Sequence, residues 1–527
     1  MGSASIRPAL PPPNGSPTDP GAREDFQRRK LQMAREAGWK RLPTTPNLLS
    51  AWSEEERRRW ERTLRLKPTR TLSGVSVVAV MTSPFPCPHG RCTYCPGGPE
   101  LRSPQSYTGE EPSALRGAQL GYDPRRIVEH RLRALREIGH PVSKVEVILM
   151  GGTFTSRPAA WQERTILGTF EGLNGQESPT LEEAQRLNVS AASRLVGLTV
   201  ETRPDQASVG QLTELVRWGV TRIEFGVESL RDPVLERVHR AHEVRHVIEA
   251  TGRARDLGLK VGYHMMPGLP GMDPEKDRED FRRLFLSEDF RPDLLKIYPC
   301  LVLEGTPLAE EYRAGRYRAY DTETAAELLS RIKEELPGYV RIHRVQRDIP
   351  ARLILDGVRK SNLRELALRK LAERGRRCPC LRCREVGRRP FEEGSAGWGL
   401  HREEYAAQGG REVFLSWEEE GSGALAGYLR LRFPRGDVPG GLTVPVIREL
   451  KVLGEEVPVD GRAPSAPTAW QHRGLGTRLL EEAATEARSH GAERLAVIAA
   501  VGTRGYYSRR GFAPYGPWMS RDLRGTP

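Results

Sequence analysis

Short apolar stretches alternate with longer amphipathic stretches from about residue 75 to residue 340, and this alternation limits the fold more than any other feature of the chain. The strand-like stretches are Val75–Met81, Val145–Met150, Leu195–Val200, Arg222–Gly226, Lys260–Met265 and Leu294–Tyr298. Helical patterns separate them, as at Pro124–Ile138, Gln206–Trp218 and Val244–Leu257. Alternation at this spacing indicates βαβ units and a parallel sheet. We therefore expect an α/β domain over residues 71–350, built as an open or closed barrel whose chemistry gathers at the carboxyl ends of its strands.

The pattern changes after residue 411, where short strands come before a helix. The expected strands are Val413–Trp417, Leu425–Arg432, Val446–Val452 and Arg494–Ala500, and the expected helix runs over Leu479–Ser489. A chain of 527 residues has room for two or three domains. We expect a second, smaller mixed α/β domain over residues 411–527.

The basic charge of the chain is concentrated in two stretches. Residues 23–70 hold 14 Lys/Arg against 7 Asp/Glu, and residues 359–389 hold 12 against 3, although the net charge of the whole chain is only +13. Localised basic patches are typical of nucleic-acid binding, but a solvated helix surface has the same composition. We expect a basic helical N-terminal region over residues 23–70 and a basic linker over residues 351–410. Residues 1–22 are rich in Pro, Gly and Ser and are expected to be disordered.

The sequence lacks the marks of a membrane or secreted protein. It has no run of about 18 apolar residues, which a membrane helix would need. Its N-terminus is not a basic segment followed by an apolar one, so it predicts no secretory signal. We therefore expect a cytoplasmic protein without a membrane span.

Six of the seven cysteines fall into two tight triplets. The first is Cys87, Cys92 and Cys95, the second is Cys378, Cys380 and Cys383, and Cys300 stands alone. An odd number of cysteines in such close groups is poor material for disulfides. Tight triplets in a cytoplasmic chain are typical of metal sites.

The first triplet has the spacing C-x4-C-x2-C and follows an expected strand. Thiolates are the ligands of iron–sulfur clusters, and three of them leave one iron of a four-iron cluster open to a cofactor or substrate. Zinc would need a fourth ligand, and His89 lies within the loop. The spacing favours iron–sulfur over zinc without deciding between them.

Small and polar residues follow the other expected strands. They are Gly151-Gly152-Thr153, Glu201-Thr202-Arg203-Pro204-Asp205, Glu228-Ser229, His264-Met265-Met266-Pro267 and Lys296-Ile297-Tyr298-Pro299. Glycines at such a turn let the backbone approach a ligand closely. Several polar clusters in succession, each at a strand end, predict one site at that edge of the barrel.

The second triplet, with spacing C-x-C-x2-C, lies among arginines in the basic linker. This spacing predicts a structural zinc with a fourth ligand from elsewhere, for which His343 and His401 are candidates. A second iron–sulfur cluster is the alternative. Arginines around a metal-bound loop would form a rigid cationic surface suited to phosphates.

The second domain contains a glycine-rich loop of the form Q-x-x-G-x-G before its helix. The residues expected to bind a cofactor are Gln471, Arg473, Gly474, Gly476 and Thr477. Backbone N–H groups at the start of a helix bind phosphate well. The loop resembles the pyrophosphate loop of the GNAT acetyltransferase superfamily. Downstream, Tyr506 and Tyr507 resemble that superfamily's tyrosine element, although either could be a packed core tyrosine.

Over residues 66–350 the chain resembles the radical S-adenosylmethionine (SAM) domain of the Elongator catalytic subunit family, in its microbial single-protein form. The matching motifs are Lys67-Pro-Thr-Arg-Thr-Leu-Ser-Gly-Val75, Cys95-Pro-Gly-Gly-Pro99, Ser106-Tyr-Thr-Gly-Glu-Glu-Pro112, Met150-Gly-Gly-Thr-Phe154, Glu201-Thr-Arg-Pro-Asp205, His264-Met-Met-Pro267, Lys296-Ile-Tyr-Pro299 and Arg344-Val-Gln-Arg-Asp-Ile-Pro350. The resemblance continues through the second triplet and the GNAT-like domain.

This resemblance implies a tRNA-modifying enzyme with four cofactors or co-substrates. Cys87, Cys92 and Cys95 would hold a [4Fe–4S] cluster, Gly151, Gly152 and Glu228 would contact SAM, and acetyl-CoA would bind the second domain. The product would be 5-carboxymethyluridine at the tRNA wobble position, made with a 5′-deoxyadenosyl radical. Zn²⁺ would occupy the second triplet.

The resemblance also suggests how the parts work together. Lys296 and Tyr298 would position or hydrolyse the acyl group, and the basic stretches would bind the anticodon stem-loop. An electron donor is needed, and a homo-oligomer is left open. The acetyl-CoA and radical sites are expected to face each other across an interface between domains.

Two other functions fit parts of the sequence. A lysine acetyltransferase with a purely structural barrel would need a general base, for which Glu449, Glu455 and Glu456 are candidates. A non-catalytic tRNA-binding scaffold would hold zinc in the first triplet and would be colourless and free of iron.

Overall fold

The computed structural model contains an open barrel of parallel strands joined to a second, mixed sheet. It describes residues 21–38, 45, 48, 52–388, 397–454, 456, 470–471 and 473–525. The barrel sheet has the order β1-β2-β3-β4-β5-β6-β8. Its strands are β1 (Val75–Met81), β2 (Lys144–Met150), β3 (Arg194–Thr202), β4 (Arg222–Glu228), β5 (Lys260–Met265), β6 (Leu294–Ile297) and β8 (Arg341–Arg344). The six strands expected from the apolar runs are therefore confirmed, and β1 and β8 are the edges of the sheet.

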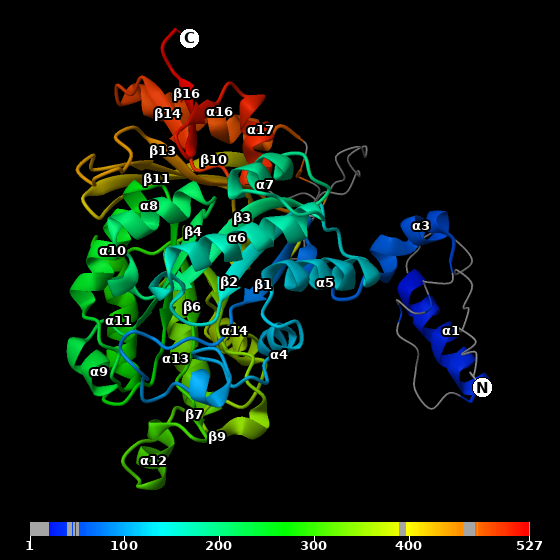
Figure 1. The fold of residues 1–527 in the computed structure, drawn as a ribbon, viewed down its shortest axis with the longest axis vertical. Helices are drawn as coiled ribbons and strands as arrows, with labels where there is room; N and C mark the ends of the chain where they lie inside the picture. Colours follow the sequence, from blue (N-terminus) through cyan, green and yellow to red (C-terminus); the bar gives the residue numbers. More distant parts are fainter. Residues whose placement is uncertain are drawn as a thin grey trace.

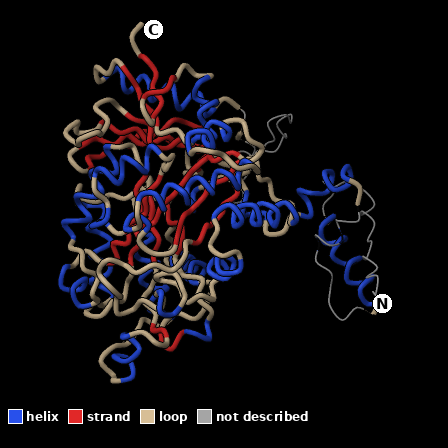
Figure 2. Tube along the Cα trace, viewed as in Figure 1, coloured by secondary structure: helices blue, strands red, loops and turns tan. Residues whose placement is uncertain are grey.

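Helices cover the outer face of the barrel (Figures 1 and 2). They are α4 (Pro112–Gln119), α5 (Pro124–Glu137), α6 (Ala159–Asn174), α7 (Leu181–Asn188), α8 (Val209–Arg217), α9 (Asp232–Arg237), α10 (Val244–Asp256), α11 (Pro274–Leu286), α12 (Pro307–Arg313), α13 (Thr322–Glu334) and α14 (Leu363–Glu373). A small two-stranded antiparallel sheet of β7 (Val302–Leu303) and β9 (Ile354–Asp356) lies beside the barrel. The expected helix at Gln206–Trp218 begins later, at Val209, because Ser208 and Gln211 form a capping box there.

The inner face of the barrel is charged rather than apolar. In β4 the apolar residues Ile223, Phe225 and Val227 belong to the main hydrophobic core. The alternate residues Arg222 and Glu224 instead pair with charged side chains of neighbouring strands. Because side chains alternate between the two faces of a strand, one face of β4 packs against helices and the other lines a polar lumen.

The second sheet has the order β10-β11-β12-β13-β14-β16-β15. Its elements are β10 (Trp398–Ala407), β11 (Gly410–Glu419), β12 (Leu425–Phe433), β13 (Val446–Val452), α16 (Leu475–Ser489), β14 (Arg494–Val497), α17 (Arg504–Ser508), β15 (Ala513–Tyr515) and β16 (Trp518–Asp522). The linker expected over residues 351–410 is therefore wrong at its end, because β10 pairs along its whole length with β11. This edge strand is largely exposed, so it lacks the apolar alternation by which strands are predicted.

The second sheet packs against the amino ends of the barrel strands (Figure 1). Arg448 of β13 makes two hydrogen bonds of 2.7 Å to Asp293, which directly precedes β6. Gln471 donates to the carbonyl oxygen of Ser73, just before β1, and Trp518 donates to the carbonyl oxygen of Leu257, before β5. Breaking a buried ion pair such as Arg448–Asp293 costs about 3–5 kcal/mol, so the two domains form a fixed unit.

The N-terminal helices project from this unit. Helices α1 (Ala22–Glu36) and α3 (Glu54–Leu64) lie to one side of the barrel, beyond the end of α5 (Figure 1). Phe26, Trp52 and Trp60 belong to a separate small apolar cluster. The helices expected within residues 23–70 are thus present. Residues 1–22, for which we expected disorder, lie almost wholly outside the described residues.

Candidate functional site

A cavity of about 970 Å³, counted with its open mouth, lies at the carboxyl ends of the barrel strands. Residues from six strand ends and from the cysteine loop line it: Cys87, Tyr94, Ser106, Tyr107, Glu111, Ser113, Met150, Gly152, Thr153, Glu201, Thr202, Arg203, Gly226, Glu228, Arg240, His264, Met266, Tyr298, Arg344, Arg347 and Asp348. We call it the radical cavity. The strand-end clusters singled out in the sequence therefore do converge on one site.

The first cysteine triplet lies on a loop beside this cavity. Cys92 and Cys95 are buried, and Cys87 is half-buried on the cavity wall. The three sulfur atoms do not all lie within 4.8 Å of one another, nor do they form such a group with His89. A single tetrahedral zinc holds its sulfurs about 3.8 Å apart, since each Zn–S bond is about 2.3 Å. A four-iron cluster binds each cysteine through a different iron, so the wider spacing fits the cluster and not one zinc ion.

Arg240 compensates charge beside the triplet. Burial raises the pKa of the Cys92 thiol to about 11, and the nearby Arg240 guanidinium opposes that rise. Arg240 donates to the Cys92 Sγ over 3.8 Å and to the carbonyl oxygen of Gly226 over 2.7 Å, and it pairs with Glu228. Thiolates at this depth need cations close by, which Arg240 and a bound iron cluster would supply.

The three residues expected to contact SAM surround the same loop. Gly151 and Gly152 have φ of 124° and 110°, and a Cβ at Gly151 would lie 2.6 Å from the Thr82 Oγ1. Gly152 and Glu228 line the cavity, whereas Gly151 lines a small recess behind it. Glu228 has a φ of 68°, which is strained for a residue with a side chain. The fold thus holds this carboxylate at the cavity in a conformation that a free strand would avoid.

Of the expected acyl-handling pair, Tyr298 lines the radical cavity and Lys296 lies behind its wall. The Lys296 Nζ lies 2.6 Å from the Glu201 Oε1 and also pairs with Glu224. These carboxylates raise the pKa of Lys296 above its usual value, so it stays charged. Burial raises the pKa of Tyr298, so it stays a phenol that can donate a hydrogen bond. Lys296 thus contacts two carboxylates and is not among the residues that line the cavity.

Three residues around Lys296 were not singled out as catalytic from the sequence. Glu201, Glu224 and His264 come together within 4.8 Å of one another, although they come from three strands. His264 contacts Glu224 over 3.0 Å and packs edge-on against Tyr298. Glu201 and His264 belong to strand-end clusters visible in the sequence. Glu224 lies inside β4, so only the alternation of charged and apolar residues there could have revealed it.

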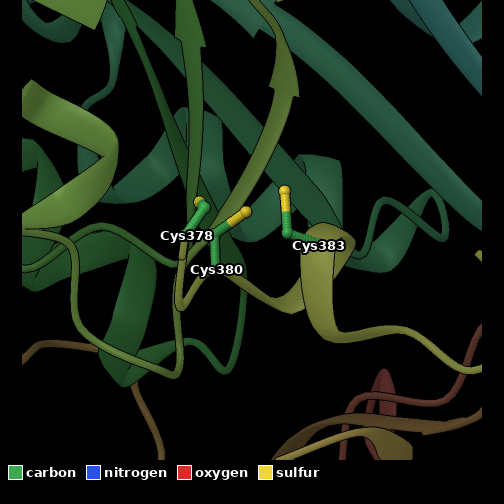
Figure 3. Close-up of side chains that lie close together, drawn as sticks. All are labelled: Cys378, Cys380 and Cys383. Carbon is green, nitrogen blue, oxygen red and sulfur yellow. The ribbon is translucent and has the colours of Figure 1, made fainter. Parts of the chain in front are cut away.

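The second triplet is compact (Figure 3). The sulfurs of Cys378, Cys380 and Cys383 all lie within 4.8 Å of one another, and the last of them belongs to the short helix α15 (Leu381–Arg384). The expected fourth ligands His343 and His401 are not part of this group. The Nζ of Lys333 lies 3.7 Å from the Cys383 Sγ. The group has the size of a single-ion site.

In the second domain, the glycine-rich loop opens α16. Gly474 caps this helix with a φ of 81°, and a Cβ at Gly476 would lie 2.6 Å from the Tyr506 hydroxyl. Thr477 accepts hydrogen bonds from Arg510, whose guanidinium also stacks on the ring of Tyr506. The amide of Gln471 is used to contact the barrel, and Arg473 lies over the ring of Trp470. The loop thus presents backbone N–H groups at a helix start, with Arg510 as an additional cation that the sequence did not suggest.

The two predicted sites lie at opposite ends of the barrel. Tyr507 lines a second cavity between the domains, at the amino ends of the strands, whereas Tyr298 and the cysteine loop lie at the carboxyl ends. The expectation that the sites face each other across an interface is therefore wrong in its geometry. The barrel lumen separates them, because the second domain packs on the strand starts.

Comparison with known proteins identifies both halves of the chain. Residues 83–285 match the radical SAM superfamily, residues 292–373 match the radical SAM C-terminal domain, and residues 467–523 match the acetyltransferase (GNAT) domain. Fold and site thus define a radical SAM protein with a fused GNAT domain. A tRNA uridine(34) acetyltransferase of Methanocaldococcus jannaschii is 42% identical over 91% of this chain and 90% of its own length. Human Elongator complex protein 3 is 40% identical over 95% of this chain and 93% of its own. The chain belongs to the Elongator complex protein 3 family.

A solved structure of the same family has the same overall fold. Archaeal Elp3 of Methanocaldococcus infernus, lacking residues 1–46, superposes with a TM-score of 0.75 at 38% identity and covers 86% of this chain and 100% of its own. The described part of the chain contains no helix that is both long enough and apolar enough to cross a lipid bilayer.

Proposed function

We propose that this protein converts the wobble uridine of tRNA to 5-carboxymethyluridine, using acetyl-CoA as carbon source and a SAM-derived 5′-deoxyadenosyl radical. The observation that carries the proposal is the cavity that joins a cysteine loop spaced for an iron–sulfur cluster to six strand ends, in a chain that also carries a GNAT phosphate loop. The names of its relatives, which act on tRNA uridine, support the same substrate.

Cys87, Cys92 and Cys95 would hold the [4Fe–4S] cluster, and Gly151, Gly152 and Glu228 would contact SAM. The cluster, when bound with SAM, supplies the radical that abstracts hydrogen from the acetyl methyl group. Arg240 balances the charge of Cys92 and fixes Glu228. Three cysteines would suffice for such a cluster, because its fourth iron would be left to SAM.

The remaining wall residues would orient the acyl group and the uridine. Tyr298 can donate its phenol proton to a carbonyl oxygen in the cavity, because its raised pKa keeps it neutral. Lys296 holds Glu201 and Glu224 in place and is a positioning residue. On the GNAT side, Gly474, Gly476 and Thr477 would bind the CoA pyrophosphate through backbone N–H groups, beside Gln471 and Arg473. Tyr506 lies next to this loop, and Tyr507 lines the cavity between the two domains.

The second triplet would bind Zn²⁺ as a structural site. Its support is the compactness of the three sulfurs, which matches the reach of one tetrahedral ion. The fourth position is open to a ligand other than His343 and His401.

The basic segments would bind the anticodon stem-loop. Arg359, Lys360, Arg369 and Arg377 are exposed on and beside α14, as a phosphate-binding surface requires. A splayed loop base is what such an enzyme can reach. The proposal also includes an external one-electron donor, a cytoplasmic location and, as an open point of assembly, a homo-oligomer.

The geometry disfavours the two other functions. For a lysine acetyltransferase, Glu449 is a poor base, because its partners Lys451 and Arg430 hold its pKa well below the usual range. The carboxylate of Glu456 pairs with Arg65 over 3.5 Å, and Glu455 lies outside the described residues. For a zinc scaffold, the first triplet is too widely spaced.

The test is nucleoside mass spectrometry after anaerobic incubation of the reconstituted protein with tRNA, SAM, reductant and ¹³C-acetyl-CoA. We expect label in 5-carboxymethyluridine with the natural chain and none with Cys92→Ala. Labelled lysine in protein with unmodified tRNA would overturn the proposal.

A further inference from the structure

The wall of the radical cavity carries a histidine backed by a buried carboxylate. His264, in β5, lines the cavity, and its side chain is 15% exposed. Its Nε2 lies 3.0 Å from the Oε2 of Glu224 in β4, whose side chain is only 2% exposed. The other ring nitrogen, Nδ1, makes no hydrogen bond with any described residue. His264 therefore has one nitrogen engaged by a carboxylate and one nitrogen free.

The ionisation of Glu224 decides which nitrogen of His264 carries the proton. Burial alone would raise the pKa of Glu224, but the Lys296 ammonium and the hydrogen bond from His264 hold that pKa well below its usual range. An ionised carboxylate can only accept hydrogen bonds, so the Nε2 of His264 is the donor. In the neutral ring the Nδ1 then carries the lone pair, which is what a general base needs.

The charges around His264 favour the uptake of one proton. Glu201 and Glu224 bring two negative charges, and Lys296, which contacts both carboxylates, brings one positive charge. The Glu201 Oε1 also lies 3.8 Å from the His264 Nε2. One negative charge is thus left over beside the ring, and an imidazolium would compensate it.

Two further cations beside this group have carboxylate partners of their own. Arg222 pairs with Glu146 as well as with Glu224. Arg344, on the cavity wall, pairs with Asp348. Their charges therefore leave the negative charge beside the histidine in place.

A neutral hydrogen-bond donor lies next to the histidine. The ring of Tyr298 packs edge-on against the His264 ring, with the ring centroids 5.7 Å apart. Tyr298 also lines the radical cavity, and its hydroxyl makes no hydrogen bond within the described residues. Burial raises the pKa of Tyr298, so the phenol keeps its proton. The wall thus holds a base and a donor side by side, the two groups that assist the addition of water to a carbonyl.

The proposed reaction needs such a pair of groups. The product, 5-carboxymethyluridine, has a free carboxylate, so water must cleave the thioester that acetyl-CoA brings. On the GNAT side, Glu449 contacts Arg430 over 3.0 Å, and Glu456 contacts Arg65 over 3.5 Å. Carboxylates held by cations are weak bases, because the cation stabilises the ionised form. The base for thioester cleavage is therefore better sought on the wall of the radical cavity.

We propose that His264 is the general base that activates water for cleavage of the thioester, with Glu224 as the positioning residue behind it. This inference rests on the proposed function. The water oxygen bonds to the thioester carbon while His264 takes a proton from the water, and Tyr298 donates a hydrogen bond to the carbonyl oxygen as that oxygen gains negative charge. The C–S bond then breaks, and the departing thiolate takes the proton from His264. The new carboxyl group releases its remaining proton to solvent.

The test separates thioester cleavage from the radical reaction. The probe is an anticodon stem-loop RNA whose wobble uridine carries a 5-carboxymethyl group as its N-acetylcysteamine thioester. The reconstituted protein is incubated with this probe in the absence of SAM, reductant and acetyl-CoA, and chromatography measures the thiol that is released. No radical forms under these conditions, so the assay is readable even if the radical half of the proposed function fails.

We expect the natural chain to release the thiol at least about a hundredfold faster than buffer does, and His264→Gln to lose that acceleration. Tyr298→Phe should be about 10- to 100-fold slower than the natural chain, because it lacks the donor to the carbonyl oxygen. The matched control His130→Gln, on an exposed position of α5, should keep the natural rate. A natural chain no faster than buffer, or a His264→Gln variant as fast as the natural chain, would overturn the proposal.

Rescue by imidazole distinguishes a chemical role from a structural one. Added imidazole should speed thiol release by His264→Gly about tenfold beyond its own reaction with the probe in buffer, because it can replace the missing base. The same addition should have no such effect when Glu224→Gln is combined with His264→Gly, since no carboxylate then orients the ring. Equal rescue of the two variants would overturn the positioning role of Glu224.

A second arm uses the complete reaction with labelled acetyl-CoA. In His264→Gln the label should reach tRNA mainly as the uncleaved CoA thioester, which hydroxylamine converts into a hydroxamate that nucleoside mass spectrometry identifies. Free 5-carboxymethyluridine formed by this variant at the natural rate would overturn the proposal. Absence of any label in tRNA with the natural chain would instead overturn the proposed function, and the thioester probe would still report on His264.

Discussion

The two cysteine triplets look alike in the sequence but differ in the structure. Both are three cysteines within ten residues, yet the second gathers its sulfurs within 4.8 Å of one another and the first does not. The first lies on the wall of a large cavity, whereas the second packs in the main core beside α13 and β8. Sulfur spacing and surroundings, rather than the count of cysteines, therefore distinguish the two triplets.

The largest effect expected from this difference is on the first triplet. Cys92→Ala should lower carboxymethyluridine formation by at least about a thousandfold, because a ligand set that acts as a unit fails when one member is removed. Iron content and the visible absorption of the cluster should fall with it, while zinc content stays. Anaerobic metal analysis and 5′-deoxyadenosine formation check this. Retained SAM cleavage would show that Cys92 is not a cluster ligand.

The second triplet should respond in stability instead. Cys380→Ser should release zinc and lower the apparent Tm by about 10 °C, roughly 3–5 kcal/mol, since the binding energy of a structural metal is folding energy. The control is Cys300→Ala, which also removes a buried thiol but lies outside both triplets. Metal analysis and thermal unfolding are the measurements. Equal Tm changes in the two variants would argue against a zinc site.

Local sequence patterns predicted the strands and the strand-end residues, but not how distant segments pack. The apolar runs at Val75–Met81 and Lys260–Met265 are strands with the same bounds, since short apolar runs of this length are typical of strands. The contact between the barrel and the GNAT domain depends on pairs such as Arg448 with Asp293, whose two residues lie far apart in the chain. The periodicity of apolar residues along one sequence does not reveal which distant residues form such pairs.

The charged lumen was also beyond sequence reasoning. Arg222 and Glu224 alternate with apolar residues in β4, which looks like a half-exposed strand, yet all seven residues are buried. Their partners Glu146 and Lys296 come from other strands. The edge strand β10 was missed for the opposite reason, because its exposed residues show no apolar alternation.

Each triplet has a buried cation beside it. Arg240 contacts Cys92 and Lys333 contacts Cys383, each by a long N–H to sulfur contact. Arg240→Lys keeps the charge but loses the forked geometry that also holds Gly226 and Glu228, so we expect product formation to fall by about 10- to 100-fold. Lys333→Met should leave that rate within about twofold and lower Tm. Steady-state nucleoside analysis and thermal unfolding of both variants separate the roles, and equal activity losses would contradict them.

The smallest expected effect concerns a carboxyl group that supports the packing around the first triplet. Asp277 accepts hydrogen bonds from the Gly268 N–H and the Tyr320 hydroxyl, and Gly268 follows the strand end that carries Met266. Burial raises the pKa of Asp277 to about 7, well above that of an unfolded aspartate. Because the folded state binds the proton more tightly, this group stabilises the fold at low pH, and that contribution is lost as pH rises from about 4 to about 7.

Asp277→Asn stays neutral at every pH and can keep the bonds that its carbonyl oxygen accepts. We therefore expect the advantage of the variant over the natural chain, in free energy of unfolding, to grow by about 1–2 kcal/mol between pH 5 and pH 8, after allowing for partial relaxation of the site. Thermal unfolding at the two pH values measures the difference. At the second triplet, we expect the stability difference between Lys333→Met and the natural chain to stay constant over this pH range. The cysteine sulfurs raise the pKa of Lys333, so this side chain stays charged throughout. If the free energy of unfolding changes with pH in the same way in the natural chain and in Asp277→Asn, the carboxyl group is ionised in the folded state. The packing around the first triplet would then accommodate the charge of Asp277 without loss of stability.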